Sequence, residues 1–479
     1  MSSVVPNPPN SRSRGNSTLS DSSDRQPRNS TSAAAISATA AAPTPTPTPS
    51  VSVSRTVPIP CQIRVDRCRR LPEFGPTLLF FSGGSAIREL SRVLKSYTHN
   101  SVHLITPFDS GGSSAEIRRT FDMLSVGDLR NRLLALSDES ALGNPEVTAL
   151  FSYRLDKERA EVARAQLKEL LSGRHPLASA VSMPMRSILL SHLRWFASRM
   201  PSDFDLRGAS VGNLIITGCF LEHDNDIVTA IYLIWTLLGA KGSVRPLTGA
   251  NLHIRTYYED GTEEVGQHRM GKARTGRKSK IVKLDLVEQL RQPSANDADR
   301  QEAQDCDVDL VSAELIASAD LITYPMGSFF SSVLVNLLPQ GVGRAIVKRN
   351  CPKIYIPNTG DDPEMHGYSL LECALLVIDL VRKDAGRAPI TDILQYILVD
   401  TRNCHYCVPV EKEKIAEMGI ALIDVQLVED EDCIDPYHAG TSLLDNVQLD
   451  EDDYCSPSSG KKHFLSPSKV LEVCLTLGS

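Results

Sequence analysis

Between Thr77 and Asp138 the sequence repeats one arrangement: a short apolar run, a turn that contains glycine and a stretch with helical periodicity. The runs 78–81 and 102–106 have the length and apolar character of buried strands. Each run is followed by a polar, glycine-containing turn and then by residues with helical periodicity. Strand, turn and helix in this order predict an α/β fold.

The turns in this stretch are candidate phosphate-binding loops. Glycine lets backbone N–H groups approach a phosphate, and the N-terminus of the following helix adds a partial positive charge. A glycine pair after a strand is often only a tight connection, but three such turns close together favour phosphate binding. The candidate residues are Ser82, Gly83, Gly84, Ser85, Gly111, Gly112, Ser113, Ser114, Arg130 and Asn131.

Two acidic residues lie in the same turns. Asp109 precedes the second glycine pair, and Asp128 lies in the third turn. A hard divalent cation prefers carboxylate oxygen, so Asp109 is predicted to bind Mg²⁺. Both aspartates are predicted to be catalytic, although Asp128 equally fits a residue that caps the next helix. Arg130 fits a bidentate phosphate clamp.

Two later segments add candidate ligand-binding residues. Ser210 and Asn213 lie in an apolar segment with several small residues, where an asparagine needs a hydrogen-bond partner. The alternative is a tightly packed helix in which the small residues only allow close contact. Gly327 and Ser328 follow one predicted strand, and Asn358 follows the next. Open α/β sheets bind ligands at such strand ends.

Several of these segments resemble the CofD/YvcK family, which comprises 2-phospho-L-lactate transferases of deazaflavin synthesis and bacterial gluconeogenesis factors that bind UDP-sugars. The resemblance rests on DSGGSSAEIRR, GDLRNRLLALSD, GASVGNLIIT and ADLITYPMGSFFSSVLVNLL, and it covers most of residues 77–424. It implies a Rossmann-like three-layer core with a mostly parallel sheet. The chain departs from the family at Ser110, where a second aspartate is usual, and at Ala209, where a histidine is usual.

The resemblance implies two alternative functions. One is Mg²⁺-dependent transfer of a 2-phospho-L-lactate-type group from a nucleotide-diphospho-lactate to a deazaflavin-like acceptor. The other is non-catalytic binding of a UDP-sugar by a regulator of central carbon metabolism or cell-wall synthesis. The three turns and Asp109 favour the transferase, whereas Ser110 in place of a second aspartate favours the regulator. A homodimer is compatible with either function.

Composition divides the chain into a central domain and two polar ends. Residues 1–57 are rich in Ser, Thr, Pro and Ala and predict a disordered tail, since they offer little apolar surface to bury. Residues 58–425 are the predicted nucleotide-binding domain, interrupted by a helical insertion at about 144–205 and a polar insertion at about 268–309. Residues 426–479 predict an acidic tail with a terminal helix.

Charge and cysteine content limit the partners and the compartment. The net charge of −7 argues against a general nucleic-acid-binding protein. No uninterrupted apolar run is long enough to span a bilayer, so no membrane partner is expected. The 11 cysteines show no disulfide-rich spacing, which predicts a cytoplasmic location. An organellar location is the alternative if the Ser-rich N-terminal segment is a transit peptide.

Three other patterns have a structural interpretation that competes with a functional one. The basic stretch 269–283 fits a phosphate-gripping lid or, slightly better, a solvated loop. Cys404 and Cys407 form a Cys-x-x-Cys pair, but a zinc site needs about four ligands and no second pair lies nearby. The arginine-rich stretch 58–74 is interpreted as a solvated edge before the first strand.

Deletion of residues 1–57 is expected to leave the melting temperature and the ligand affinity unchanged, because a disordered tail makes few buried contacts. Thermal unfolding and calorimetric titration of the full and the truncated chain measure both quantities. A melting temperature that falls by several degrees would show that the tail packs on the central domain.

Overall fold

The computed structural model describes residues 56–140, 143–270, 279–291, 301–429 and 465–479. All of the elements below belong to the compact unit Val57–Ser479. The segment predicted to be a disordered tail, most of the predicted acidic tail and most of the basic stretch lie outside the described residues.

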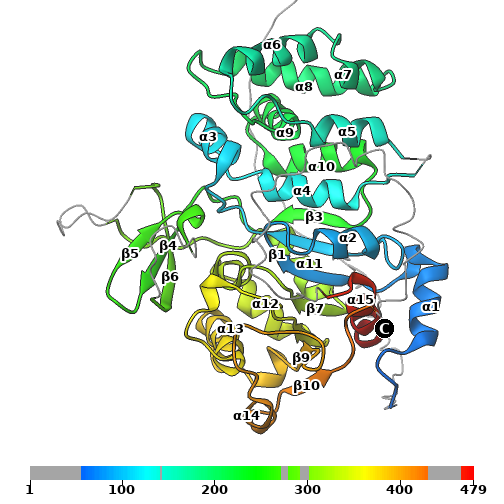
Figure 1. Cartoon of the computed structure of the whole chain (residues 1–479), viewed down its shortest axis with the longest axis vertical. Coiled ribbons are helices and arrows are strands. Elements are labelled where there is room, and N and C mark those ends of the chain that lie inside the picture. The colour runs from blue at the N-terminus through cyan, green and yellow to red at the C-terminus, as the bar shows by residue number, and fades with distance from the viewer. Residues whose placement is uncertain (1–55, 141–142, 271–278, 292–300, 430–464) are drawn as a thin grey trace, which may run out of the picture. The chain divides into compact units, whose positions relative to one another are not determined.

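A seven-stranded parallel sheet forms the centre of this unit, in the order β10-β9-β8-β7-β1-β2-β3 (Figure 1). Every pair of neighbouring strands is parallel. The sheet confirms the predicted α/β class with mostly parallel strands. Its strands are β1 (Leu78–Ser82), β2 (Val102–Ile105), β3 (Ser243–Pro246), β7 (Leu321–Tyr324), β8 (Lys353–Tyr355), β9 (Tyr396–Val399) and β10 (Ala421–Asp424).

The strand order reverses beside β1. From β1 the chain moves outward through β2 to β3, and it later returns to β7 on the other side of β1. The connections that leave β1 and β7 therefore lead to opposite faces of the sheet. In open α/β sheets, ligands bind in the crevice that such a reversal opens at the carboxyl ends of the strands.

Two helical layers cover the sheet. Leu78 and Phe80 of β1 pack with α1, α2 and α15 on one face, and Leu79 and Phe81 pack with α11, α12 and α13 on the other. Successive side chains of a strand point to opposite faces, so a continuously apolar strand needs cover on both. The helices are α1 (Gln62–Arg70), α2 (Arg88–Leu94), α11 (Leu310–Ser318), α12 (Val342–Lys348), α13 (Leu370–Ala385), α14 (Lys412–Glu417) and α15 (Pro467–Gly478).

The helices between β2 and β3 share a separate apolar cluster and lie together at the top of Figure 1. They are α3 (Gly112–Phe121), α4 (Gly127–Leu136), α5 (Pro145–Ser152), α6 (Ala160–Leu171), α7 (Pro176–Ala180), α8 (Met185–Arg199), α9 (Val211–Glu222) and α10 (Ile227–Leu238). α8 and α9 cross so closely that a Cβ on Gly218 would lie 1.8 Å from the carbonyl oxygen of His192. Within the described ranges, no helix combines the length and apolar character that a membrane span requires.

A smaller antiparallel sheet, β5-β4-β6, lies between β3 and α11 in the sequence. β4 (His253–Tyr258) pairs with both β5 (Glu263–Val265) and β6 (Ile281–Val287). β6 lies within the segment 268–309, so part of the predicted polar insertion is regular sheet. Apolar and charged residues mix in β6, as in a half-buried strand, and the basic and acidic runs around it mask this pattern.

Two segments outside the sheets have a structure that their sequences did not predict. The stretch interpreted as a solvated edge contains α1, whose Val65 and Cys68 are buried on the side that packs against α15. After β7, Phe329–Val333 form a π-helical turn and Leu334–Leu337 a 3-10 turn. Side chains from a later loop bind the backbone N–H groups of the π-helical turn.

Gly218→Ala is expected to destabilise the folded chain by roughly 1–3 kcal/mol, because the added methyl group would have to push α8 and α9 apart. Urea unfolding followed by circular dichroism measures the change. Gly249→Ala is the matched control, since a Cβ there would meet no atom within 4 Å. Equal stability of the two variants would contradict the close helix crossing.

Candidate functional site

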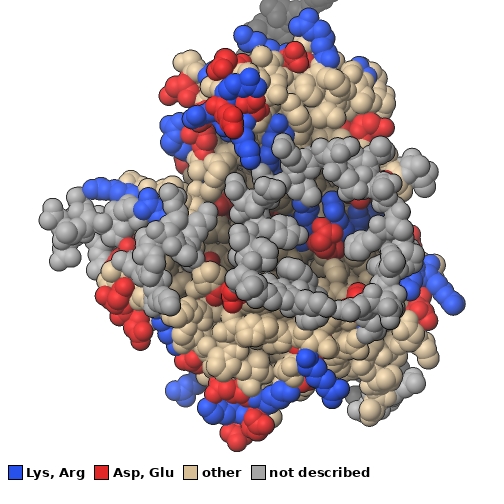
Figure 2. Space-filling model, in the orientation of Figure 1, with Lys and Arg blue, Asp and Glu red and all other residues tan. Residues whose placement is uncertain are grey.

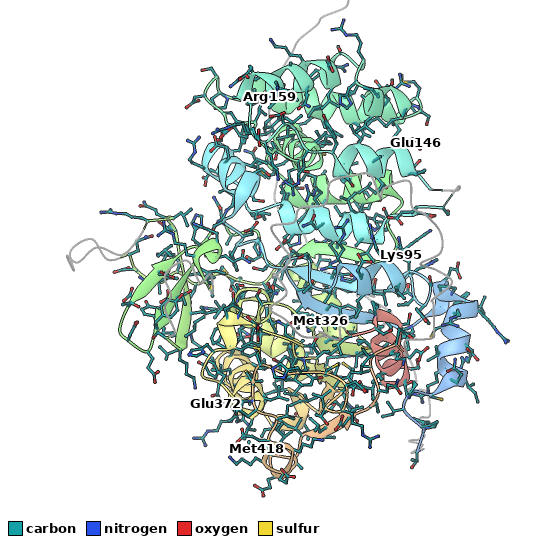
Figure 3. All side chains as sticks on the ribbon, in the orientation of Figure 1. Lys95, Glu146, Arg159, Met326, Glu372 and Met418 are labelled. Carbon is teal, nitrogen blue, oxygen red and sulfur yellow. The ribbon has the colours of Figure 1, made fainter. Side chains whose placement is uncertain are left out.

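The loops that follow β1 and β7 meet where the strand order reverses. A Cβ on Gly327, after β7, would lie 3.8 Å from the Cβ of Ala86, after β1. A Cβ on Gly84 would lie 3.9 Å from Ser332 Oγ. Met326, labelled in Figure 3, belongs to the loop after β7 and packs against the apolar cluster of β1. We call the space between the loops 83–87 and 325–328 the switch-point crevice.

The turn after β1 requires glycine at both of its central positions. Gly84 has a φ of +51°, in the left-handed region where a side chain is strained. A Cβ on Gly83 would lie 2.7 Å from Thr106 Cγ2 and 3.4 Å from Asp128 Oδ2. The turn therefore lies against the end of β2 and the start of α4. α2 begins only at Arg88, so its N-terminus lies beyond the turn rather than in it.

The turn after β2 folds its aspartate back onto its own backbone. Asp109 Oδ1 accepts a hydrogen bond from the Gly111 N–H at 2.9 Å. α3 begins at Gly112, whose φ is +49°, and Ser114 lies in its first turn. A Cβ on Gly127 would lie only 2.6 Å from Ser114 Oγ. The starts of α3 and α4 therefore meet.

Two carboxylates lie beside these turns. Asp109 Oδ2 is 3.6 Å from the position of a Cβ on Gly127, and Asp128 is the next residue of α4. The N-cap of α4 is Val126 and no side chain caps this helix, so the alternative that Asp128 serves as its cap is wrong. Burial lowers the pKa of Arg132 to about 10, and the carboxylate of Asp128 opposes that shift.

Four buried hydroxyl groups near these strand ends have no hydrogen-bond partner in the described part of the chain. They belong to Ser82 at the end of β1, Thr106 after β2, Ser125 before α4 and Thr323 in β7. A buried polar group without a partner costs about 1–3 kcal/mol, and most such groups are satisfied. A polar ligand or water bound here would satisfy them. Of these four residues, only Ser82 was identified as a candidate from the sequence. The other three could have been found from the position of their hydroxyl groups at or near the ends of predicted strands.

The start of α9 contacts the second and third turns. Ser210 is the N-cap of α9, and Asn213 Nδ2 donates to Ser113 Oγ at 3.4 Å. Asn213 Oδ1 is buried and has no hydrogen-bond partner among the described residues. A Cβ on Gly212 would lie 2.9 Å from Arg130 Cδ. The small residues therefore allow close helix packing here, and Asn213 also has a buried acceptor oxygen that lacks a hydrogen-bond partner among the described residues.

Arg130 and Asn131 are linked to each other. Arg130 Nη2 donates a hydrogen bond to Asn131 Oδ1 at 2.6 Å. Arg130 is buried, and Asn131 is half-buried. The bond orients the Arg130 side chain, whose Cδ lies against Gly212 at the start of α9.

The chain itself occupies the predicted anion cradle after β7. Asn358 Oδ1 accepts a hydrogen bond from the Gly327 N–H, and Asn358 Nδ2 donates to Gly327 O, both at 2.7 Å. The Phe329 N–H donates to Asp362 Oδ2 at 3.0 Å. The prediction that Gly327, Ser328 and Asn358 form a phosphate cradle is therefore corrected, because side chains of the chain already bind the donors on either side of Ser328.

Glu364 completes this internal arrangement. Its carboxylate accepts hydrogen bonds from the backbone N–H groups of Phe330 at 2.8 Å and Ser331 at 2.9 Å, and from the Ser331 hydroxyl at 2.7 Å. Burial and, second, the carboxylate of Asp362 raise the pKa of Glu364 to about 7. Sequence reasoning missed both acids because the backbone groups that they bind lie more than thirty residues away.

A histidine next to the small antiparallel sheet reaches the second turn. Gln267–Arg269 form a 3-10 turn after β5, in which His268 Nδ1 lies 2.9 Å from Ser110 Oγ. Arg118 of α3 donates to Leu252 O, just before β4. These contacts connect the small sheet to the second turn. Sequence reasoning missed His268 because it is 158 residues from Ser110 in the chain.

The carboxylates suit Mg²⁺ only in combination with a ligand. In the described ranges, no group of three or more His, Cys, Asp and Glu side chains could hold a metal ion alone. Mg²⁺ usually keeps several waters and is bound through one or two carboxylates together with substrate phosphates. Asp109 and Asp128 provide that donor set beside the glycine turns. Cys404 and Cys407 are free thiols.

Comparison with known proteins finds one family over most of the chain. The family described as "2-phospho-L-lactate transferase CofD" matches residues 78–428. The gluconeogenesis factor of Halalkalibacterium halodurans is 25% identical over 364 residues, which cover 74% of this chain and 90% of that protein. A putative gluconeogenesis factor of a Nostoc species is 27% identical over 299 residues, 62% of this chain, and this match spans only 50% of that relative.

A solved structure has the same fold. The crystal structure of a UPF0052 family protein from Bacillus halodurans superposes with a TM-score of 0.51 and 23% sequence identity. The superposition covers 74% of this chain and 94% of that protein. At this level of identity the likeness concerns the fold, and it agrees with the parallel sheet and its helical layers.

Glu364 predicts a pH dependence of stability. Its pKa rises from 4.5 to about 7 on folding, so between these values the folded chain holds a proton that the unfolded chain releases. The corresponding stabilisation is complete below the lower value and is lost as the pH rises through the upper one. At 1.36 kcal/mol per pH unit, the shift is worth at most about 3 kcal/mol.

Glu364→Gln is expected to flatten this dependence, because the amide keeps the shape and does not titrate. Urea midpoints of both chains at pH 5.5 and pH 8 measure the slope. Glu314→Gln, at an exposed position, should keep the slope of the wild type. The same slope in wild type and Glu364→Gln would contradict the assignment of the titrating group.

Proposed function

The chain belongs to the 2-phospho-L-lactate transferase CofD family, and on that premise we propose that it binds a nucleoside-diphosphate compound with Mg²⁺ and transfers a phosphorus-containing group to a hydroxyl acceptor. The donor would lie across the carboxyl ends of β1, β2 and β7. Its diphosphate would face the turns at residues 82–85 and 109–114. The strand reversal beside β1 supports this location, since it is where open α/β sheets bind nucleotides.

One observation carries the proposal: two carboxylates lie beside the glycine turns that would bind the phosphates. Asp109 and Asp128 neighbour Gly127 and Gly83, whose turns would hold the phosphates. A carboxylate next to a phosphate repels it unless a cation lies between them. Simple binding of an anion would be stronger without these acids. Their presence therefore favours a ligand that arrives with a divalent cation.

Each group of the crevice has a role in this proposal. Asp109 and Asp128 would hold Mg²⁺, which, when bound, would offset negative charge on the phosphates during transfer. The hydroxyls of Ser82 and Thr106 would donate to phosphate or sugar oxygens and so gain the partners that they lack. Arg130 would contribute positive charge from the α9 side. These groups would act by positioning and charge stabilisation.

The proposed reaction is an exchange of phosphorus–oxygen bonds. The hydroxyl oxygen of the acceptor forms a bond to the phosphorus that carries the transferred group, and the phosphoanhydride bond to the nucleoside monophosphate breaks. The hydroxyl proton leaves to solvent, and the nucleoside monophosphate departs with the bonding electrons. The acceptor that the resemblance favours is a deazaflavin-like alcohol.

A second candidate function is regulation through binding of a UDP-sugar without turnover. The relatives are named gluconeogenesis factors, a description that gives a physiological role and no reaction. Ser110 lies next to Asp109, and the contact between Ser110 Oγ and His268 Nδ1 at 2.9 Å connects the second turn to the small antiparallel sheet. A ligand at this turn could therefore alter the position of that sheet, which is the arrangement expected of a sensor.

Asp109→Asn is expected to bind the nucleotide as before when Mg²⁺ is absent. In the presence of Mg²⁺ its affinity should be at least tenfold lower than that of the wild type, because an amide binds a hard cation poorly. Calorimetry with UDP-N-acetylglucosamine and with a nucleotide-diphospho-lactate, each with and without Mg²⁺, measures the four affinities. Turnover is followed separately by release of nucleoside monophosphate in the presence of a deazaflavin alcohol.

Asp203→Asn, at an exposed position, is the control and should behave as the wild type. Affinity that does not depend on Mg²⁺ in the wild type would overturn the metal-dependent proposal. Mg²⁺-dependent binding of UDP-N-acetylglucosamine without turnover of either compound would favour the regulator instead.

A further inference from the structure

One side of α1 is basic and apolar and has no described partner. Val65 and Cys68 are buried on the side that packs with α15, whereas Ile63, Arg67 and Arg70 are exposed. At helical spacing, the positions 63, 67 and 70 lie opposite 65 and 68. The helix therefore has one side in the core and a second, mixed side that faces outward.

Two further apolar side chains extend this side beyond the end of the helix. Leu71 is 57% and Phe74 84% exposed, and Ile63 is 72% exposed. Basic side chains project at the right edge of Figure 2, where Figure 1 places α1. Large exposed apolar residues beside cations are typical of a binding surface. The α1 surface consists of Ile63, Arg67, Arg70, Leu71 and Phe74.

The residues that flank the segment 430–464 meet at the start of α15, the helix that packs against α1. The hydroxyl of Ser466 donates a hydrogen bond to the carboxylate of Glu429, which joins the two ends of the segment. Burial raises the pKa of Glu472 in α15, Arg69 of α1 opposes the shift, and Glu429 adds to it. Glu472 therefore lies within electrostatic range of both α1 and the start of the segment.

We propose that the α1 surface binds the segment 430–464 of the same chain. This segment contains nine Asp and Glu residues, and its two basic residues, Lys461 and Lys462, lie at its far end. Its part 442–454 reads SLLDNVQLDEDDY and so combines large apolar residues with a run of four acids. An apolar and acidic segment complements an apolar and basic surface in both respects.

Tethering favours this occupant over a separate molecule. The segment has 35 residues between its flanking described residues, so its middle reaches up to about 55 Å from either end. A binding partner that is tethered to its binding surface by the same chain has an effective concentration on the order of millimolar. The inference does not depend on the proposed nucleotide chemistry.

Phe74→Trp in the full chain converts the α1 surface into a fluorescence reporter. The parent chain already has two tryptophans, so the fluorescence of the new tryptophan is obtained by subtracting the fluorescence of the parent chain. Acrylamide quenching of the new tryptophan is expected to be roughly two-fold weaker than in the same chain with D450N, E451Q, D452N and D453N. Sodium chloride at 1 M should weaken the protection, because salt screens attraction between exposed charges.

Four exposed acids elsewhere provide the control, E158Q, E161Q, E413Q and E417Q, which should leave the protection unchanged. Equal quenching with and without the acids at 450–453 would overturn the proposal. Protection that grows with protein concentration would assign the surface to a second copy, and protection only with phosphatidylserine vesicles to a membrane; both would also overturn it. Ile63→Trp repeats the measurement if Phe74→Trp does not fold.

Discussion

The backbone donors after β7 are bound by side chains of the same chain, and the crevice at the centre of the sheet depends on this arrangement. A turn at the start of a helical segment leaves N–H groups without partners. Here Asn358, Asp362 and Glu364 accept hydrogen bonds from them, and the amide of Asn358 is bound at both of its polar atoms. This side of the crevice is complete before any ligand arrives. The proposed ligand would therefore bind at the turns after β1 and β2, where buried hydroxyls lack partners among the described residues.

The sequence predicted what local chemistry determines. Apolar runs of strand length, followed by glycine turns and helical periodicity, located β1, β2 and the segments after them, and the resemblance supplied the parallel sheet. The strand order and the contacts between distant segments were beyond such reasoning. Gly327 and Asn358 are 31 residues apart, and the same two residue types fit an open phosphate cradle until their mutual hydrogen bonds are seen. Thr106 was missed because its contact with Gly83, in the turn after β1, cannot be inferred from the residues around it.

The candidate site combines features that point to charge compensation. Asp109 and Asp128 lie beside the glycine turns that would bind phosphate, and Arg130 lies against the start of α9. Under the proposed function, a site of this composition would favour a diphosphate that carries a divalent cation over one that does not. Such a preference would serve a transferase, which needs the cation during transfer, and equally a regulator that recognises the cation-bound form of a nucleotide. The difference between them lies in whether an acceptor hydroxyl is held next to the phosphorus, and that depends on residues outside the turns.

The packing of α15 has a consequence for how this protein is made. A Cβ on Gly478 would lie 3.0 Å from Leu78 Cδ2, and the Cys61 N–H donates to Thr476 Oγ1 across 415 residues of chain. The first strand and helix therefore lack their cover until α15, which lies some 415 residues after α1, has left the ribosome. During translation the apolar face of β1 and α1 is open to solvent, and a polypeptide in this state is a substrate for chaperones. α15 completes the apolar cover of β1, so the crevice beside β1 is fully packed only after α15 has left the ribosome.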